Sequence, residues 1–129
     1  MAGIDSALGI SPQVLMLRSQ RMNLLAANIA NADTPNYKAQ DIDFRSALTA
    51  ATEQRQQVST SHERHIPLGG DLNSPEVLYR RPTQLALNGN TVEPHKEHTE
   101  FMDNAIRYQA SLQMLDSRIK GLRAAIKGE

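Results

Sequence analysis

The sequence predicts a mainly α-helical protein in which two long N- and C-terminal helices pack as a coiled-coil-like pair, with a small irregular or β-hairpin segment between them. Three observations favour this fold. An apolar seam with alternating spacings of four and three residues runs through the last third of the chain, which is the a/d pattern of a coiled coil. Apolar residues also recur at every seventh position near the N-terminus. The stretch between these seams is polar and rich in turn-forming residues.

The C-terminal segment, residues 91–129, is predicted to form one long helix over residues 93–127. Acidic side chains crowd its first turns and basic side chains its last turns, an order that complements the helix macrodipole. A helix with so narrow an apolar stripe needs another helix beside it, because an isolated helix would leave the stripe exposed to water. The seam consists of Phe101, Ala105, Tyr108, Leu112, Leu115, Ile119, Leu122 and Ile126.

The N-terminal segment, residues 1–35, supplies the second helix. Ser11 is expected to be its N-cap, with Pro12 at the first helical position, where the missing N–H costs nothing. The helix should stop before Pro35, because proline disfavours helical geometry at the residue that precedes it. Its seam consists of Leu8, Leu15, Met22 and Ile29, with Leu25 and Ala26 on the same side.

The middle segment, residues 36–90, changes character. Residues 41–44 alternate polar and apolar, which predicts a short extended segment, and residues 45–57 contain good formers of a polar helix. A second strand is expected at residues 77–80. The Asn-Gly-Asn sequence at residues 88–90 is a strong turn signal before the last helix. We expect a small β-hairpin as the ordered form of this segment.

The composition of the chain excludes several classes. At 129 residues it has room for one domain, and its hydrophobic share of 40% includes only 4% aromatic residues. The formal net charge is zero, without the basic stripe that nucleic-acid binding usually requires. No apolar run approaches the roughly 18–20 residues of a membrane span. The first residues lack the basic and apolar regions of a cleaved secretory signal, so any export is expected to follow another route.

The most specific motif closes the first helix, where residues 26–38 read Ala-Ala-Asn-Ile-Ala-Asn-Ala-Asp-Thr-Pro-Asn-Tyr-Lys. This segment resembles the pattern A-x-N-[IL]-A-N-x-x-T-P-[GN]-Y-[KR] shared by the axial proteins of the bacterial flagellum. Residues 38–44, 89–92 and 107–126 are similar to the proximal rod proteins of the basal body, the FlgB family. Asn36 stands where that family commonly has Gly, and Asn tolerates left-handed backbone geometry.

The resemblance implies a structural subunit of the flagellar rod, the periplasmic drive shaft for motility, and no cofactor. The paired terminal helices would form the inner layer of a tube, and the subunit would leave the cytoplasm through the flagellar type III export apparatus without a cleaved signal peptide. The implied partners are copies of the chain itself, other rod proteins, and the membrane-ring and export-gate base. Neither nucleic acid nor a direct membrane span is expected.

The residues of the motif also have a physical interpretation as an assembly motif. Asn28 and Asn31 are three residues apart and share one face of a helix. In a single chain we expect solvated amides, whereas in a tube they can bond between subunits and fix register, as a buried Asn does in coiled coils. Thr34 and Pro35 would end the helix and direct the chain outward, and Tyr37 would anchor the turn. The alternative is a plain helix stop with an exposed tyrosine.

The histidines allow a weaker hypothesis, a metal site. His62 and His65 form one H-x-x-H pair, and His95 and His98 form another. On a helix this spacing places both imidazoles on one face, so a two-plus-two zinc or nickel site is conceivable. The chain has no Cys to support it, and the neighbouring residues are ordinary charged surface. The sequence therefore favours ordinary charged surface over a metal site, and a metal-binding protein is kept only as an alternative.

An enzyme is not predicted either. Asp41 and Asp43 resemble paired carboxylates, but we expect them to be solvated or paired with basic residues of a neighbouring subunit. Neither a nucleophile elbow nor a phosphate-binding loop is present in the sequence.

The four methionines within the two helices, Met16, Met22, Met102 and Met114, are expected as core filler. The alternatives that stay open are another rod subunit of the same family, a cytoplasmic helical adaptor or coiled-coil protein, and a metal-binding protein.

Overall fold

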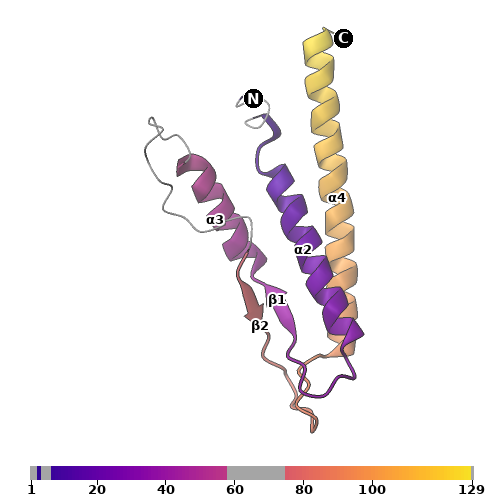
Figure 1. Ribbon diagram of the computed structural model, residues 1–129. Helices are drawn as coiled ribbons and strands as arrows, with labels where there is room; N and C mark the ends of the chain where they lie inside the picture. Colours follow the sequence, from indigo (N-terminus) through magenta and orange to yellow (C-terminus); the bar gives the residue numbers. More distant parts are fainter. Residues whose placement is uncertain (1–2, 4–6, 58–74, 129) are drawn as a thin grey trace.

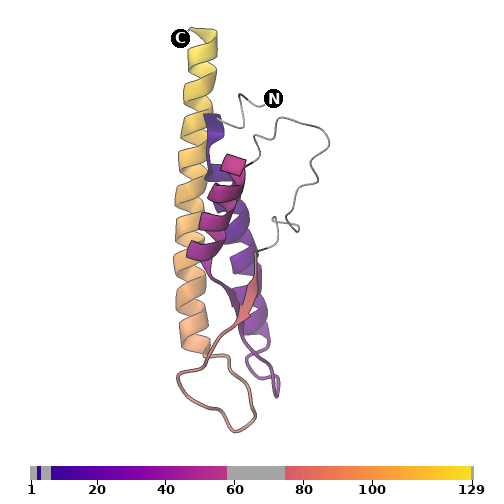
Figure 2. The ribbon, with the colours of Figure 1, turned by 90° about the vertical axis from the view of Figure 1, so that its left-hand side faces the viewer.

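The computed structural model describes residues 3, 7–57 and 75–128. Two long helices lie side by side and run in opposite directions, and a short helix with a two-stranded sheet lies against the first of them (Figures 1 and 2). Among the described residues, no helix is both long and apolar enough to span a bilayer. The elements follow in the order α2 (Ser11–Ala30), β1 (Gln40–Ile42), α3 (Phe44–Gln57), β2 (Val77–Tyr79) and α4 (Pro94–Lys127).

The helical pair confirms the predicted fold class. Helix α4 has 34 residues and α2 has 20, so α2 is too short to cover α4 along its whole length. In Figure 1 the C-terminal turns of α4 extend beyond the start of α2. Arg118 marks this level, because its guanidinium donates to the Leu8 carbonyl just before α2, at 3.0 Å. The seam after Arg118 therefore continues past the helix that covers its first part.

The buried core of the subunit is small and half polar. Its buried apolar side chains come from α2 and from the chain around β1, namely Leu17, Leu25, Ala39 and Ile42. Among the described residues, four polar or charged side chains are also buried, namely Asn28, Asn90, Glu97 and Asn104. Because a buried polar group is costly unless it is hydrogen-bonded, these four must be held in specific arrangements. Their partners define the site described below.

The middle segment contains the expected strands and helix. Strands β1 and β2 pair antiparallel, with Gln40 opposite Tyr79 and Ile42 opposite Val77. The first extended segment is shorter than predicted, because Phe44 already opens α3. Helix α3 matches the polar helix expected over residues 45–57 and lies beside α2 (Figures 1 and 2). The expectation that includes His62 and His65 lies outside the described residues.

The start of α2 differs from the sequence prediction in its capping, and α4 also begins without a side-chain cap. Ile10, with helical backbone angles, is the N-cap of α2, so the assignment of Ser11 as N-cap is wrong. The backbone is already close to helical before Ser11, which places the Ser within the first turn. Glu93 precedes α4 without a side-chain bond to the helix, because its carboxylate instead accepts hydrogen bonds from the N–H and hydroxyl of Thr83. Pro12 follows in the first turn of α2 as expected, and Pro94 has the same place in α4.

Candidate assembly motif and helix seam

Asn28, the first asparagine of the motif, lies inside the subunit and is fully buried. Its Nδ2 donates to the carbonyl of Gln40 at 2.8 Å and to Glu97 Oε2 at 3.1 Å. Its Oδ1 accepts from the Gln40 N–H at 3.0 Å and from the Tyr37 hydroxyl at 3.4 Å. The prediction of a solvated amide is wrong for this residue, because the chain turns back after Pro35 and lays β1 against α2.

Asn31 behaves differently from Asn28 and does not share its environment. Its Nδ2 donates to the carbonyl of Ala27 at 2.8 Å, and its Oδ1 accepts from the Thr34 hydroxyl at 3.1 Å. The side chain thus bonds to its own helix end, where Asn31 is the C-cap of α2. Thr34 and Pro35 are exposed in the turn that follows. A role of these residues in contacts between subunits stays a prediction.

Asn90 caps the C-terminal end of α2, a role that the sequence did not reveal. Its Nδ2 lies 3.0 Å from the carbonyl of Asn31, 2.9 Å from that of Ala32 and 2.8 Å from that of Thr34. The side chain is only 5% exposed. Asn31 is the C-cap of α2, and Ala32 and Thr34 lie in the turn after it, so a side chain from a distant turn holds the chain where it leaves the helix. The Asn-Gly-Asn signal identified this turn, but not the helix end that it serves.

Two left-handed residues shape the contact between the motif and this turn. Asn36 has a φ of 60° and Gly89 a φ of 74°, and the Asn36 N–H donates to the carbonyl of Asn88 at 2.9 Å. A Cβ on Gly89 would lie 2.5 Å from Asn36 Oδ1, so only glycine fits without displacement. The Thr91 N–H donates to the Tyr37 carbonyl at 3.0 Å. The predicted tolerance of Asn36 for left-handed geometry is confirmed.

An ionic network joins α2, the sheet and α4. Arg21 Nε lies 2.9 Å from Asp41 Oδ1, and Arg21 Nη2 lies 2.8 Å from Glu100 Oε2. Arg80 Nη2 lies 2.6 Å from Asp41 Oδ2, and the same guanidinium bonds to the fully buried Glu97. The expectation that Asp41 is solvated or pairs with a neighbouring subunit is wrong, because both of its cations come from this chain. Arg21, Arg80, Glu97 and Glu100 were not identified from sequence, since their partners are distant along the chain.

The pKa of Asp41 reflects this environment. Burial alone raises the pKa of the Asp41 carboxyl, but the hydrogen bonds from Arg21 and Arg80 outweigh burial, and the pKa is lowered. The bond to Asp41 in turn raises the pKa of Arg21. Asp43 is exposed, and its pKa is lowered chiefly by a hydrogen bond from the Ser46 hydroxyl. The two aspartates therefore have separate partners and do not form a carboxylate pair.

Asn104 sets a polar contact within the helix pair. It is fully buried, and its Nδ2 donates to the carbonyl of Arg18 on α2 at 2.8 Å. The guanidinium of Arg18 lies 4.4 Å from the ring centroid of Phe44. Asn104 lies three residues after Phe101 and four before Tyr108, on the same face of the helix, so a polar residue beside the seam was the available signal. Buried asparagines fix register in coiled coils, and Asn104, rather than Asn28, has that position here.

The seam residues are covered unevenly in the single chain. On α2, Leu15, Met22 and Ile29 are half-buried, and on α4 so are Phe101, Tyr108, Leu115 and Leu122. Three seam residues of α4 are exposed, Leu112 at 42%, Ile119 at 39% and Ile126 at 84%. The expectation that the methionines fill the core is wrong for Met16, Met102 and Met114, which are also exposed. Much of the apolar surface of the long helices thus faces solvent.

The metal hypothesis gains no support. His95 and His98 are both exposed on the first turns of α4. Within the described ranges, no group of three or more His, Cys, Asp or Glu side chains is arranged to hold a metal ion.

Helices with apolar faces left open, without a metal or catalytic cluster in the described part of the chain, favour a structural class of protein. Comparison with known proteins supports this class. A family model described as flagella basal body rod protein matches residues 15–38, which include most of α2 and the motif. The chain is 50% identical to the flagellar basal body rod protein FlgB of Cereibacter sphaeroides, over all of both chains. It is 43% identical to the protein of that name from Salmonella typhimurium, over 97% of this chain and 96% of the relative.

The protein of that name from Escherichia coli K12 is also 43% identical, over 92% of this chain and 91% of the relative. The chain therefore belongs to the FlgB family of flagellar basal body rod proteins. It is a structural subunit of the rod and not an enzyme, as the resemblance to the FlgB family implied.

Proposed function

We propose that this subunit assembles into the periplasmic rod through its two terminal helices, contacting copies of itself and other rod proteins. The observation that supports this most directly is the uncovered part of the α4 seam, where Ile119 is 39% and Ile126 84% exposed. Exposed apolar surface of this kind on a monomer commonly marks an interaction site. Neighbouring helices in a tube would cover it.

The three segments divide the work in this proposal. Residues 1–35 and 91–129 supply the helices that meet neighbours, and the described elements of the middle segment, β1 and α3, lie against α2. The assembly motif, Asn28 to Tyr37, acts first within the subunit: its bonds to Gln40 and to the turn at Asn90 hold α2 at a fixed angle to the rest of the chain. Every copy then presents the same surface to its neighbours, which a regular assembly requires.

The finer parts of the proposal concern location and neighbours. Export by the flagellar apparatus without a cleaved signal would bring the chain to the periplasm, where it would contact the membrane-ring and export-gate base at one end and other rod proteins at the other. The names of the relatives favour this account over another rod subunit and over a cytoplasmic adaptor.

Complementation tests the proposal. The chain is expressed in a flagellated bacterium from which the FlgB gene has been deleted, and swimming and the composition of isolated basal bodies are measured. We expect swimming to return and the chain to be present in the basal bodies at its full length. A chain that is made in normal amount but stays in the cytoplasm of non-motile cells would favour the adaptor alternative.

A further inference from the structure

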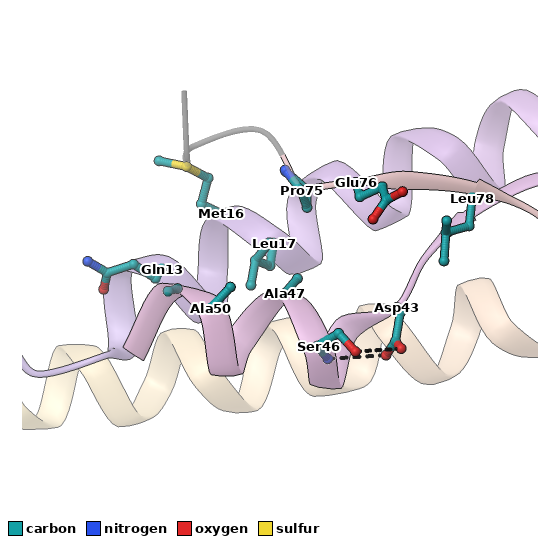
Figure 3. A pocket seen from close by; sticks show the side chains of 11 residues that line it. Gln13, Met16, Leu17, Asp43, Ser46, Ala47, Ala50, Pro75, Glu76 and Leu78 are labelled. Atoms are coloured by element: carbon teal, nitrogen blue, oxygen red, sulfur yellow. Dashed lines mark hydrogen bonds between the residues drawn. The ribbon is translucent and has the colours of Figure 1, made fainter. Parts of the chain in front are cut away.

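An apolar groove lies between α2, α3 and β2, outside the assembly motif and the ionic network. Its volume is about 420 Å³. Figure 3 shows that the small side chains of Ala47 and Ala50 on α3 leave this space open opposite Leu17 on α2. Apolar residues at its edge face solvent, with Met16 47% and Leu78 44% exposed. The groove is therefore suited to bind apolar side chains. In the described part of the structure, no side chain of this chain fills it.

A loop at the other end of the molecule presents apolar side chains of the right kind. It comprises residues 83–88 and lies at the end of the molecule opposite the C-terminus of α4 (Figures 1 and 2). Leu85 is 93% exposed and Leu87 is fully exposed. Thr83 is bonded to Glu93, and the Asn88 carbonyl accepts from the Asn36 N–H at 2.9 Å, so both ends of the loop are fixed to other parts of the chain. A fixed loop loses little entropy on binding.

The charges beside the groove and beside the loop are complementary. Asp43 and Glu76 line the groove, and both are exposed. Arg81 is exposed at the base of the loop. Across the described ranges, none of these three side chains forms an ion pair. Opposite charges at the edge of an interface steer association and fix its register.

From these features we infer that the loop of one copy, with Leu85 and Leu87, docks into the groove of the next copy, where Arg81 faces Asp43 and Glu76. The inference deepens the proposed function, on which it rests for the association between copies. The loop and the groove are different surfaces, so when each copy offers its loop to the next copy the contact is heterologous and continues from copy to copy. The contact joins middle segments, and is separate from the helix seam.

Disulfide cross-linking tests the contact, and the chain offers a clean background because it has no cysteine. Two single-cysteine variants, Ala50→Cys in the groove and Leu87→Cys in the loop, are purified and mixed under mild oxidation. Both positions are exposed, so neither change disturbs the fold. A disulfide requires Cα atoms within about 7 Å, so its formation reports close approach. The comparison partner is Ile126→Cys, an exposed apolar position on the seam.

We expect Ala50→Cys to form a mixed dimer with Leu87→Cys about tenfold faster than with Ile126→Cys at equal concentrations, because docking raises the effective concentration of the loop at the groove. Equal rates would overturn the inference. A faster reaction with Ile126→Cys would also overturn it, and would assign the groove to the helix seam of another copy.

Charge exchange tests the orientation of the same contact. Adding Arg81→Glu to the loop variant should slow the reaction with Ala50→Cys severalfold, and adding Glu76→Lys to the groove variant should restore it. Lys96→Glu, an exposed cation elsewhere, is the matched control and should leave the rate unchanged. If Arg81→Glu has no larger effect than Lys96→Glu, the inferred register is wrong. If the cross-link does not form but the chain restores swimming, the inferred loop contact is wrong and the rod function stands. If the cross-link forms but the chain does not restore swimming, the result counts against the rod function alone.

Discussion

The side chain of Asn28 pairs with the backbone of Gln40 through both ends of its amide, donating to the carbonyl at 2.8 Å and accepting from the N–H at 3.0 Å. An amide side chain has the same donor and acceptor as a peptide unit, so Asn28 occupies the place of a strand residue beside β1. It thereby fixes the path of the chain after α2 to the helix itself. The motif that closes the first helix therefore stabilises the fold of the subunit itself.

The first prediction concerns this pairing. Asn28→Asp replaces the donor with an oxygen that would face the Gln40 carbonyl and the buried Glu97, so we expect the free energy of unfolding to fall by about 2–4 kcal/mol. Urea denaturation followed by circular dichroism measures it. The control is Asn23→Asp, at an exposed position of the same helix, with an expected change within about 0.5 kcal/mol. Equal effects of the two substitutions would contradict the assigned role of Asn28.

Two glycine-to-alanine substitutions are expected to change the free energy of unfolding in opposite directions. Gly89→Ala combines a left-handed φ with a Cβ only 2.5 Å from Asn36 Oδ1, and should cost about 1–3 kcal/mol. Gly121→Ala lies in α4 with open space around its Cβ, and should stabilise the helix by about 0.5–1 kcal/mol. Thermal unfolding compares both with the parent chain. A Gly89→Ala variant as stable as the parent would show that the turn adapts freely.

Acid sensitivity follows from the lowered pKa of Asp41. A carboxyl whose folded pKa lies below its unfolded value of about 3.9 contributes stability above that pH, and this contribution is lost as pH falls through the folded value. We expect Asp41→Asn to be less stable at neutral pH and to lose less stability below about pH 4 than the parent. Asp103→Asn, which removes an exposed pair with Arg107, should retain the parental profile. The prediction fails if Asp41→Asn shows the same acid-induced loss as the parent chain.

Hydrogen exchange tests how far α2 stabilises α4 in the isolated subunit, which we expect to be a monomer or weak oligomer. Isolated helices are marginal without packing, and α4 continues past the level of Arg118, where the segment before α2 contacts it. Amides of residues 119–127 should therefore exchange faster than those of residues 101–112. Uniform protection along α4 in dilute solution would show that its last turns need no neighbour.

The sequence predicted those features of the fold that depend on local pattern. The two seams, Pro12, Pro35 and the turn at Gly89 located the long helices and their ends, because periodicity and proline geometry act within a few residues. The partners of the buried polar groups could not be predicted in this way. Local pattern predicts Asn28 to be a surface amide, because its partner on β1 is reached only when the chain folds back. Likewise Arg80 and Glu97 are bonded in space but lie on different elements, and no local pattern predicts that they meet.

The same limit applies to the assembly residues. The seam pattern identified Ile119 and Ile126 as apolar contact positions, but how much of α4 the shorter α2 covers depends on the register of the two helices. That register involves Asn104, whose bond to the Arg18 carbonyl joins residues that are distant in the sequence. Sequence reasoning therefore found the surface and missed the contact that positions it.

The central claim is that the uncovered seam of α4 is an assembly surface, and one pair of variants tests it most directly. Ile119→Asp places a charge on the seam, and Ser117→Asp places it on the opposite side of the same helix, since two residues correspond to about 200° of rotation. Both are expressed in the deletion strain, and rods are counted in isolated basal bodies at equal expression of the subunit. We predict that Ile119→Asp abolishes rod formation and swimming while Ser117→Asp retains both. Normal rods with Ile119→Asp would contradict the account.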